Sequence, residues 1–254
     1  MPAINCKTFS CVKNRLEQAA EFLPRVKSER WVQIDVSDGK FTKAKSWNNP
    51  EQLKELRIKN KELKNISIET HLMVNNLRPN VLKWLKFGAN RIIFHFENLA
   101  ASLEASLALN GRAAEGEPRQ GRDENEFKFL KTISKKNKSI KFGLAITPKT
   151  PVEIIVPFLQ GRGSTRIAQP EFGFDFVQLL AVNPGYSGQN FDKKTIKKIK
   201  FLKKNHPKTI IEIDGVINPQ TAKMCKKAGA NIINSGSYIF NSDDPKGAYK
   251  KLQI

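Results

Sequence analysis

The sequence predicts an α/β fold, a single (β/α)8 TIM barrel with two longer loop insertions. Eight short β-rich runs alternate with segments of helical periodicity along the 254 residues, which is typical of βα units in a parallel sheet. A chain of this length with 39% hydrophobic residues can bury one sizeable core. We therefore expect one domain over residues 1–254, with an active site at the carboxyl ends of the strands.

The expected strands are rich in β-branched and aromatic residues and are bounded by turn residues. They are Ile4–Phe9, Trp31–Val36, Ile66–Val74, Arg91–Phe96, Ile140–Ile146, Phe176–Val182, Ile210–Ile213 and Asn231–Asn234. The expected helices are Cys11–Phe22, Pro50–Asn60, Val81–Phe87, Glu126–Asn137, Val152–Phe158, Lys193–Lys204, Gln220–Lys227 and Pro245–Leu252. Segments 98–125 and 160–173 exceed ordinary βα loops and contain Gly, Pro and charge, so they are predicted as insertions near the rim.

The formal net charge of +20 raises the question of a polyanionic partner. Much of this charge lies in the segment Lys193–Lys204, where Ile196, Ile199 and Leu202 recur every third residue as one apolar helical stripe. The lysines then form the solvated face of that helix. Because arginine and aromatic residues are not interleaved with them, a nucleic-acid partner is not expected. The charge can instead steer anionic substrates inward.

The cellular compartment is predicted from what the chain lacks. No run of eighteen apolar residues appears, and the start MPAINCKTFS does not resemble a signal peptide. We therefore expect no membrane partner and a cytoplasmic location. The three cysteines, Cys6, Cys11 and Cys225, are odd in number and lack metal-ligand spacing, so they are interpreted as reduced thiols without a role.

The segment 210–240 has the composition of a phosphate pocket. A strand ends at Asp214, and the next strand ends in Ser235-Gly236-Ser237. Glycine and small polar residues at two neighbouring strand ends allow backbone N–H groups to converge on an anion. In a (β/α)8 barrel the loops after strands 7 and 8 commonly build such a site.

Polar side chains also gather on the inward faces of three strands. Because strand side chains alternate, Gln33 and Asp35 point into the barrel mouth, and His71 and Asp214 do so from two other strands. Asp and His are competent ligands for a divalent metal, and two carboxylates can form an acid/base pair. The residues that share these inward faces, Glu69 with His71 and Glu212 with Asp214, either orient the ligands or form an ordinary buried polar layer.

The order of these motifs resembles the ribulose-phosphate 3-epimerase family over nearly the whole chain outside the two insertions. The resemblance rests on Asp35-Val36-Ser37-Asp38-Gly39-Lys40-Phe41, His71-Leu72-Met73-Val74, Phe94-His95-Phe96-Glu97, Val182-Asn183-Pro184-Gly185-Tyr186-Ser187-Gly188-Gln189-Asn190-Phe191, Asp214-Gly215 and Ser235-Gly236-Ser237. The Asp-x-Lys-x-x-Asp pattern of the related decarboxylases is absent at strand 2.

The resemblance implies an isomerase of the pentose phosphate pathway that interconverts D-ribulose 5-phosphate and D-xylulose 5-phosphate by proton transfer at C3. Asp35 and Asp214 would be the acid/base residues, and one divalent ion (zinc, iron(II) or manganese, with magnesium as a further option) would be held by Asp35, His71, Asp214 and Gln33. Residues expected to contact the ketose phosphate are His71, Met73, Gly185, Tyr186, Ser187, Gly188, Asp214, Gly215, Val216, Gly236 and Ser237. His95 is interpreted as structural, and a homo-oligomer is compatible with the family.

Four positions depart from the family pattern. Gln33 stands where the family has a histidine ligand, Ser37 replaces a methionine, Val216 replaces the second glycine after the strand 7 aspartate, and Lys7 falls at the strand 1 serine. A glutamine carbonyl coordinates a hard ion but suits zinc less well, so either the metal affinity would fall or the metal preference would move toward manganese or magnesium. Two alternatives stay open: an epimerase for a ketohexose 6-phosphate such as allulose 6-phosphate, and a non-catalytic sugar-phosphate-binding barrel.

Overall fold

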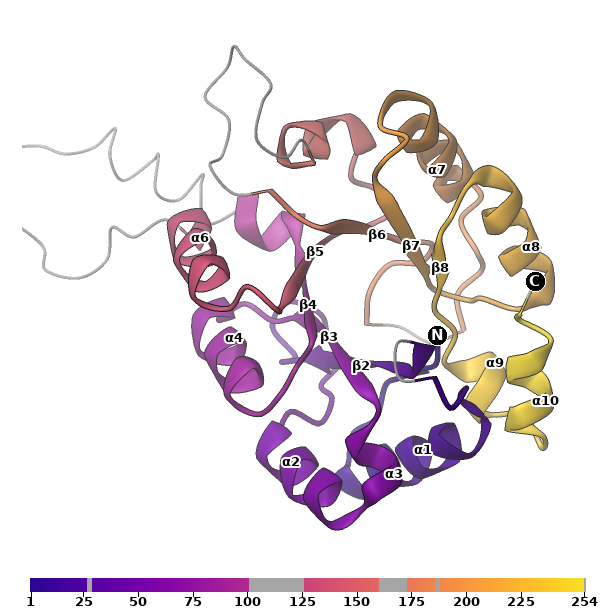
Figure 1. Ribbon diagram of the computed structural model, residues 1–254. Coiled ribbons are helices and arrows are strands. Elements are labelled where there is room, and N and C mark those ends of the chain that lie inside the picture. The colour runs from indigo at the N-terminus through magenta and orange to yellow at the C-terminus, as the bar shows by residue number, and fades with distance from the viewer. Residues whose placement is uncertain (27–28, 101–125, 160–172, 186–187, 254) are drawn as a thin grey trace, which may run out of the picture.

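The computed structural model describes residues 1–26, 29–100, 126–159, 173–185 and 188–253. Eight parallel strands form one sheet in the order β1 to β8, with helices around its outside (Figure 1). The last strand returns to the first: Pro2 bridges Ser235 in parallel, and the Ala3 N–H donates to the Ser235 carbonyl at 3.0 Å. The sheet is therefore closed, and the predicted (β/α)8 barrel is confirmed.

The strands are β1 (Ala3–Ile4), β2 (Trp31–Ser37), β3 (Ser67–Met73), β4 (Arg91–His95), β5 (Lys141–Ile146), β6 (Phe176–Leu180), β7 (Ile210–Asp214) and β8 (Ile232–Ile233). The helices are α1 (Phe9–Phe22), α2 (Pro50–Lys59), α3 (Lys61–Lys64), α4 (Leu77–Lys86), α6 (Glu126–Lys136), α7 (Lys194–Asn205), α8 (Pro219–Ala228), α9 (Ser237–Phe240) and α10 (Pro245–Lys250). A 3-10 helix, η2, covers Val152–Phe158.

The clearest differences from the expected elements concern the first strand, the segment Val152–Phe158 and two short helices. The first strand ends at Ile4 instead of Phe9, because the Thr8 side chain accepts from the Cys11 N–H and starts α1 at Phe9. The segment Val152–Phe158 is a 3-10 helix with Pro157 inside it, and proline cannot supply the N–H that an α-helix interior uses. The short helices α3 and α9 were not predicted from the sequence.

The strands bury both faces, as expected when helices cover a parallel barrel. The outward side chains of β2, namely Val32, Ile34 and Val36, are at most 1% exposed. The barrel interior is polar at its centre: four fully buried side chains, none with measurable exposure, are Gln33, Glu69, Gln178 and Glu212. These polar groups need partners inside the barrel, and that network forms the floor of the candidate site.

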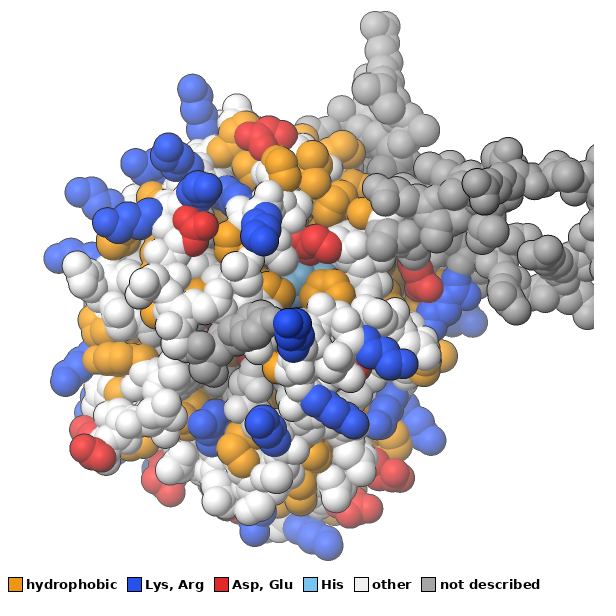
Figure 2. Space-filling view, turned by 180° about the vertical axis from the view of Figure 1, so that it is seen from behind, with side chains coloured by type: hydrophobic (Ala, Val, Ile, Leu, Met, Phe, Trp, Pro, Cys, Tyr) orange, Lys and Arg blue, Asp and Glu red, His pale blue; other side chains and the backbone are white. Residues whose placement is uncertain are grey.

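The lysine-rich helix α7 departs from its prediction at one residue. Ile199 and Leu202 are buried as the stripe requires. Lys198, predicted on the solvated face, is instead 9% exposed, and its ammonium donates to the carbonyls of Thr147, Pro148 and Thr150 at 2.7–2.9 Å. The other charges spread widely: Figure 2 shows lysine and arginine side chains over much of the visible face, with no single continuous band.

The cysteines also differ from the prediction. Cys6, which follows β1, and Cys11 in α1 form a disulfide, so the interpretation of these two as reduced thiols is wrong, whereas Cys225 is a free, buried thiol. None of the described helices is long and apolar enough to span a membrane. The predicted insertions lie largely outside the described residues, which stop at 100 and 159 and resume at 126 and 173.

Candidate active site

Asp35, His71 and Asp214 converge at the carboxyl ends of β2, β3 and β7, as the strand alternation predicted. One ligand atom from each lies within 4.8 Å of the other two. His71 Nδ1 is 3.3 Å from Asp35 Oδ1 and 4.0 Å from Asp214 Oδ2. The two carboxylates keep 13% and 16% of their side-chain surface exposed, whereas His71 keeps 1%. The cluster is therefore open to a small ligand from the barrel mouth and closed beneath.

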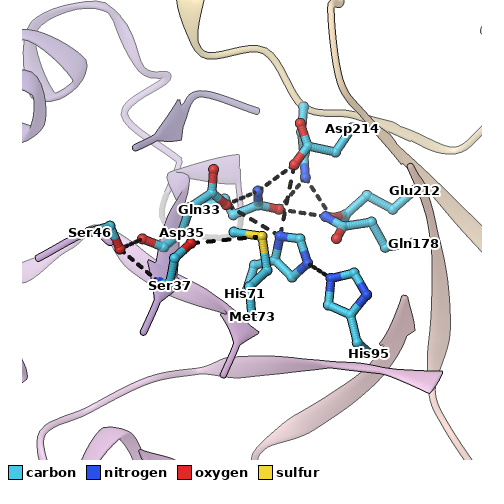
Figure 3. A network of polar contacts seen from close by, with 11 residues as sticks. Gln33, Asp35, Ser37, Ser46, His71, Met73, His95, Gln178, Glu212 and Asp214 are labelled. Atoms are coloured by element: carbon cyan, nitrogen blue, oxygen red, sulfur yellow. Dashed lines mark hydrogen bonds and ion pairs between the residues drawn. The ribbon is translucent and has the colours of Figure 1, made fainter. Parts of the chain in front are cut away.

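The amide of Gln33 lies between the two carboxylates (Figure 3). Its Nε2 donates to Asp35 Oδ1 and to Asp214 Oδ2, both at 2.8 Å. Its Oε1 points the other way and accepts from Gln178 Nε2 at 2.6 Å and from Asn234 Nδ2 at 2.5 Å. The resemblance placed Gln33 among the metal ligands. In this structure its amide nitrogen, and not its carbonyl oxygen, faces the two carboxylates, and its part in metal binding stays a prediction.

Glu212 lies one layer deeper and orients the amides that hold Gln33. Its Oε1 accepts from Gln178 Nε2 at 2.8 Å and from Asn234 Nδ2 at 2.6 Å. Burial raises the pKa of Glu212. It raises the pKa of neighbouring Glu69 well above its usual value too, with the charge of Glu212 adding to the effect and Arg91, 3.3 Å away, opposing it.

The expected link from Glu212 to the site therefore exists, but it is indirect. Glu212 reaches Asp214 through two amides and Gln33. Glu69 instead pairs with Arg91 across to β4. Neither glutamate has a hydrogen bond to His71 or Asp214 among the described residues.

Asp214 can hold a proton near neutral pH. Burial, followed by the negative charge of Asp35, raises its pKa from 3.8 to about 7, while His71 and the Gln33 hydrogen bond oppose the rise. A carboxyl group with a pKa close to the working pH can both give and take a proton, which is the property that acid/base catalysis needs.

A relay of hydrogen bonds runs from His71 away from the carboxylates. His71 Nε2 lies 2.9 Å from His95 Nε2, and His95 Nδ1 lies 3.1 Å from Glu97 Oε2. Burial lowers the pKa of His95, so the ring is neutral. Burial opposes ionisation of Glu97 as well, but hydrogen bonds from His95, Thr150 and Thr147 lower its pKa to about 2.

These charges fix the tautomers of both rings. The Glu97 carboxylate can only accept, so His95 Nδ1 carries the hydrogen and His95 Nε2 accepts from His71 Nε2–H. His71 Nε2 is thereby occupied by the hydrogen bond to His95, so Nδ1 is the nitrogen left to face Asp35 and Asp214. His95, interpreted from the sequence as structural, thereby also sets the chemistry of His71.

The other oxygen of Glu97 is held by the loop after β5. Glu97 Oε1 accepts from the Thr147 N–H at 2.8 Å and from the Thr150 hydroxyl. Lys198 in turn donates to carbonyls of this same loop, including Thr147 and Thr150. The buried lysine of α7 therefore supports the relay that ends at His71.

The donor set fits a divalent metal ion. Asp35, His71 and Asp214 bring one ring nitrogen and two carboxylate oxygens within 4.8 Å of one another, which is a ligand set that zinc, iron(II) and manganese accept. Without a cation the two carboxylates repel each other, which contributes to the raised pKa of Asp214. The two hydrogens of the Gln33 amide reach only the carboxylates.

Met73 and Ser37 line the site beside Asp35. Met73 is 4% exposed and Ser37 2% exposed, and the Ser37 hydroxyl lies 4.0 Å from the Met73 sulfur. Ser46, a residue that the sequence did not single out, donates to the Asp35 carbonyl and accepts from the Ser37 N–H, both at 2.8 Å. It fixes the backbone that carries the first aspartate (Figure 3).

The predicted phosphate-binding residues lie at the ends of β7 and β8. Gly215 has φ 107°, and a Cβ there would come within 2.8 Å of Val182 Cγ2, so only glycine fits. Val216 has φ 52°, a conformation that is strained for a β-branched residue. A Cβ on Gly236 would come within 2.6 Å of the Ala3 carbonyl oxygen, and Ser237 begins α9.

The loop after β6 approaches the loop after β2. A Cβ on Gly185 would come within 2.6 Å of Thr42 Cβ, so glycine allows the close contact. Gln189 closes the loop on itself by accepting from the Asn183 N–H at 3.1 Å and donating to its carbonyl at 2.6 Å. Gly188 has φ 78°. Tyr186 and Ser187 lie outside the described residues, and the substrate roles of this loop stay predictions.

Comparison with known proteins points to one family. A model described as "Ribulose-phosphate 3 epimerase family" matches residues 7–109 and 122–240. The chain is 28% identical over 215 residues to "Ribulose-phosphate 3-epimerase, cytoplasmic isoform" of Oryza sativa subsp. japonica, covering 85% of this chain and 77% of that relative. It is 27% identical over 223 residues to "Ribulose-phosphate 3-epimerase" of Schizosaccharomyces pombe, covering 88% and 80%.

The solved structures agree on the fold. The 3-hexulose-6-phosphate synthase from Salmonella typhimurium superposes with a TM-score of 0.61 at 13% identity, covering 99% of this chain and 94% of that one. At this identity the likeness concerns the barrel alone. The family model, in contrast, spans most of the sequence, including the strand ends that carry Asp35, His71 and Asp214. On that ground, the chain belongs to the ribulose-phosphate 3-epimerase family.

Proposed function

We propose that this chain interconverts D-ribulose 5-phosphate and D-xylulose 5-phosphate by moving the proton at C3. The observation that carries the proposal is the meeting of two carboxylates from β2 and β7 beside His71, with ligand atoms within 4.8 Å of one another at an open barrel mouth. Epimerisation next to a carbonyl needs one group to remove a proton and a second to return one on the opposite face. Asp35 and Asp214 supply that pair.

Asp214 is the proton-donating partner. In the metal-free chain burial and the charge of Asp35 raise its pKa to about 7, so this carboxyl group exchanges a proton near neutral pH. In the reaction direction in which Asp214 donates a proton, Asp35 removes the proton from C3. In the opposite direction Asp214 removes the proton and Asp35 donates one. A divalent metal, held by Asp35, His71 and Asp214, would supply the positive charge that stabilises the developing oxyanion. Gln33 fixes the positions of both carboxylates by donating one hydrogen bond to each.

The remaining site residues bind and enclose the substrate. The backbone N–H groups of Gly215, Val216, Gly236 and Ser237 would hold the phosphate, since glycine lets the chain approach an anion closely. Met73 gives the reacting centre an apolar wall, as its burial to 4% exposure allows. Gly185, Tyr186, Ser187 and Gly188 would cover the sugar and exclude water.

Turnover of the two sugars with defined metals tests the proposal. Purified protein is stripped with a chelator and assayed with ribulose 5-phosphate and allulose 6-phosphate after zinc, manganese, iron(II) or magnesium is restored. Metal-restored turnover of ribulose 5-phosphate with the higher kcat/KM supports the proposal. A higher kcat/KM for allulose 6-phosphate would show that the substrate is the hexose phosphate and not ribulose 5-phosphate. Binding of both sugars without turnover would show that the chain is a non-catalytic sugar-phosphate-binding barrel.

The hexose alternative rests on one observation. Val216 is 39% exposed and stands in the predicted phosphate loop with a left-handed backbone, so its side chain changes the shape of that end of the pocket. A pentose phosphate pathway role and a cytoplasmic location are proposed with the pentose activity. The name of the rice relative, a cytoplasmic isoform, supports that location.

A further inference from the structure

We propose that Gln33 is a hydrogen-bond donor that positions Asp35 and Asp214, and that the chain therefore offers a divalent metal three side chains, Asp35, His71 and Asp214. The inference deepens the proposed function, because it concerns the ligand set of the same site. It rests on the direction of one amide, which the surrounding groups determine.

Every hydrogen-bonding position of the Gln33 amide is filled. The NH2 group has two hydrogens, and these go to Asp35 Oδ1 and Asp214 Oδ2. The carbonyl oxygen has two lone pairs, and these accept from Gln178 and Asn234. Gln33 has no measurable exposure, so water does not compete for any of the four positions.

The amides below Gln33 are themselves oriented by Glu212. Gln178 and Asn234 each donate one hydrogen to Gln33 Oε1 and the other to Glu212 Oε1. A carboxyl oxygen accepts from both groups whether Glu212 is ionised or not, so the arrangement does not depend on a titration. Their own carbonyl oxygens have no partner among the described residues. If the amide of Gln178 or Asn234 were turned over, its carbonyl oxygen would face the oxygens Glu212 Oε1 and Gln33 Oε1. Both of its hydrogen bonds to these oxygens would then be lost.

Reversing Gln33 would be unfavourable at both of its ends. The carbonyl oxygen would then face two carboxylate oxygens, and the NH2 group would face the NH2 groups of Gln178 and Asn234. Even with a proton on Asp214, three of the four hydrogen bonds would become repulsive contacts inside a buried, low-dielectric site. Coordination of a metal through Gln33 Oε1 needs this reversal, because the oxygen now lies on the side away from the carboxylates (Figure 3).

Two consequences follow for a bound metal. Three protein ligands leave more coordination positions for oxygens of water or substrate than four would. The Gln33 NH2 group meanwhile orients the two carboxylates and binds their oxygens without contributing a ligand. In this role Gln33 is a positioning residue for the acid/base pair.

A crystal structure of the unaltered chain loaded with Mn²⁺ tests the ligand set directly. We expect Mn²⁺ bonded to Asp35, His71 and Asp214, with no atom of Gln33 within roughly 2.5 Å of the ion. A bond from Gln33 Oε1 to Mn²⁺ would overturn the proposal. Absence of saturable binding of Mn²⁺ and Zn²⁺ by calorimetry would overturn the three-ligand site as well.

A variant tests the same point in solution. Gln33→Met keeps an unbranched side chain of similar length and removes the amide. If Gln33 only positions ligands that both metals share, the Kd values for Mn²⁺ and Zn²⁺ change together and their ratio stays within about 3-fold. Loss of a hard oxygen ligand would instead weaken Mn²⁺ more than Zn²⁺ and move the ratio by about 10-fold or more.

His71→Gln is the matched control, because it exchanges a ligand nitrogen for an amide oxygen and should move the ratio toward Mn²⁺. Circular dichroism checks that both variants fold. If Gln33→Met does not fold, the crystal structure of the unaltered chain with Mn²⁺ still decides the question. All of these measurements are made without sugar. A chain that binds metal as expected and fails to epimerise would therefore refute the proposed function and leave the role of Gln33 intact.

Discussion

The Nε2 atom of His71 lies 2.9 Å from the Nε2 atom of His95. Two nitrogens at this distance share one hydrogen, so the protonation of His95 determines which nitrogen of His71 has a free lone pair. Because Glu97 accepts from His95 Nδ1 at 3.1 Å, His71 donates from Nε2, and Nδ1 is the nitrogen left to face the carboxylates. A residue outside the metal cluster therefore prepares its one nitrogen ligand.

Glu97→Gln should reverse this relay. The new NH2 group can donate to His95 Nδ1, which moves hydrogens along the chain and leaves one on His71 Nδ1. We expect metal affinity to fall by about 10–100-fold, the usual effect of losing a partner behind a ligating histidine. Calorimetry measures the affinity, and ¹⁵N NMR of the imidazoles reports the tautomer. Glu62→Gln, at a site with 77% side-chain exposure, is the control; an unchanged tautomer in Glu97→Gln would contradict the relay.

Asp214 makes the metal-free protein sensitive to pH. Its pKa rises from 3.8 to about 7 on folding, so the folded chain binds the proton more tightly and stability falls as pH rises through that window. Asp214→Asn removes this titration. Relative to the unaltered chain, the variant should gain about 2–3 kcal/mol more at pH 8 than at pH 5.

Urea unfolding with chelator at the two pH values measures the effect. Asp243→Asn, which changes an exposed carboxylate, serves as the control and should show no comparable pH dependence. A gain from Asp214→Asn that is equal at both pH values would show that Asp214 does not titrate in this range.

Val216 stores local backbone strain. A left-handed conformation costs a residue with a Cβ about 1–2 kcal/mol, and glycine does not have this cost. Glycine also gives the unfolded chain more conformational freedom, which lowers the stability of the folded state by about 0.4–1 kcal/mol and offsets part of the gain. Val216→Gly should therefore stabilise the protein by up to about 1 kcal/mol. Val216→Ala retains the Cβ and should show no such gain. Denaturant unfolding compares the two, and equal stabilities would remove strain as the explanation.

The disulfide predicts a distinct pattern of thiol reactivity. With Cys6 and Cys11 bonded and burial raising the pKa of the Cys225 thiol to about 12, the native unreduced chain should react slowly with a thiol reagent. Unfolding without reductant should release one thiol per chain, because only Cys225 is free. Three thiols under those conditions would show that the Cys6–Cys11 bond does not form in solution.

Strand alternation was sufficient to predict the centre of the site. Asp35, His71 and Asp214 sit at inward positions of β2, β3 and β7, and parallel strands bring their carboxyl ends to one rim. The sequence positions of these residues therefore predicted their meeting. The limits of the first strand were less predictable, because the Thr8 side chain caps α1 within an apparently continuous β-rich run.

The direction of the Gln33 amide could not be predicted from the sequence. It depends on Gln178 and Asn234, which lie 145 and 201 residues further along the chain, and on their shared acceptor Glu212. A polar Gln178 within the apolar strand β6 was the available signal. Lys198 was misplaced for a similar reason: helical periodicity identifies an apolar stripe, but the loop carbonyls that bury this lysine belong to Thr147, Pro148 and Thr150.

The most direct test of the account follows the proton at C3. Ribulose 5-phosphate is incubated in D2O with metal-loaded protein, and NMR records xylulose 5-phosphate and deuterium at C3. We predict both in the unaltered chain, and losses of about 10²–10⁴-fold for Asp35→Asn and Asp214→Asn, the range expected when an acid/base residue is removed. If protein that binds the metal gives no deuterium exchange at C3 and forms no xylulose 5-phosphate, the account is contradicted.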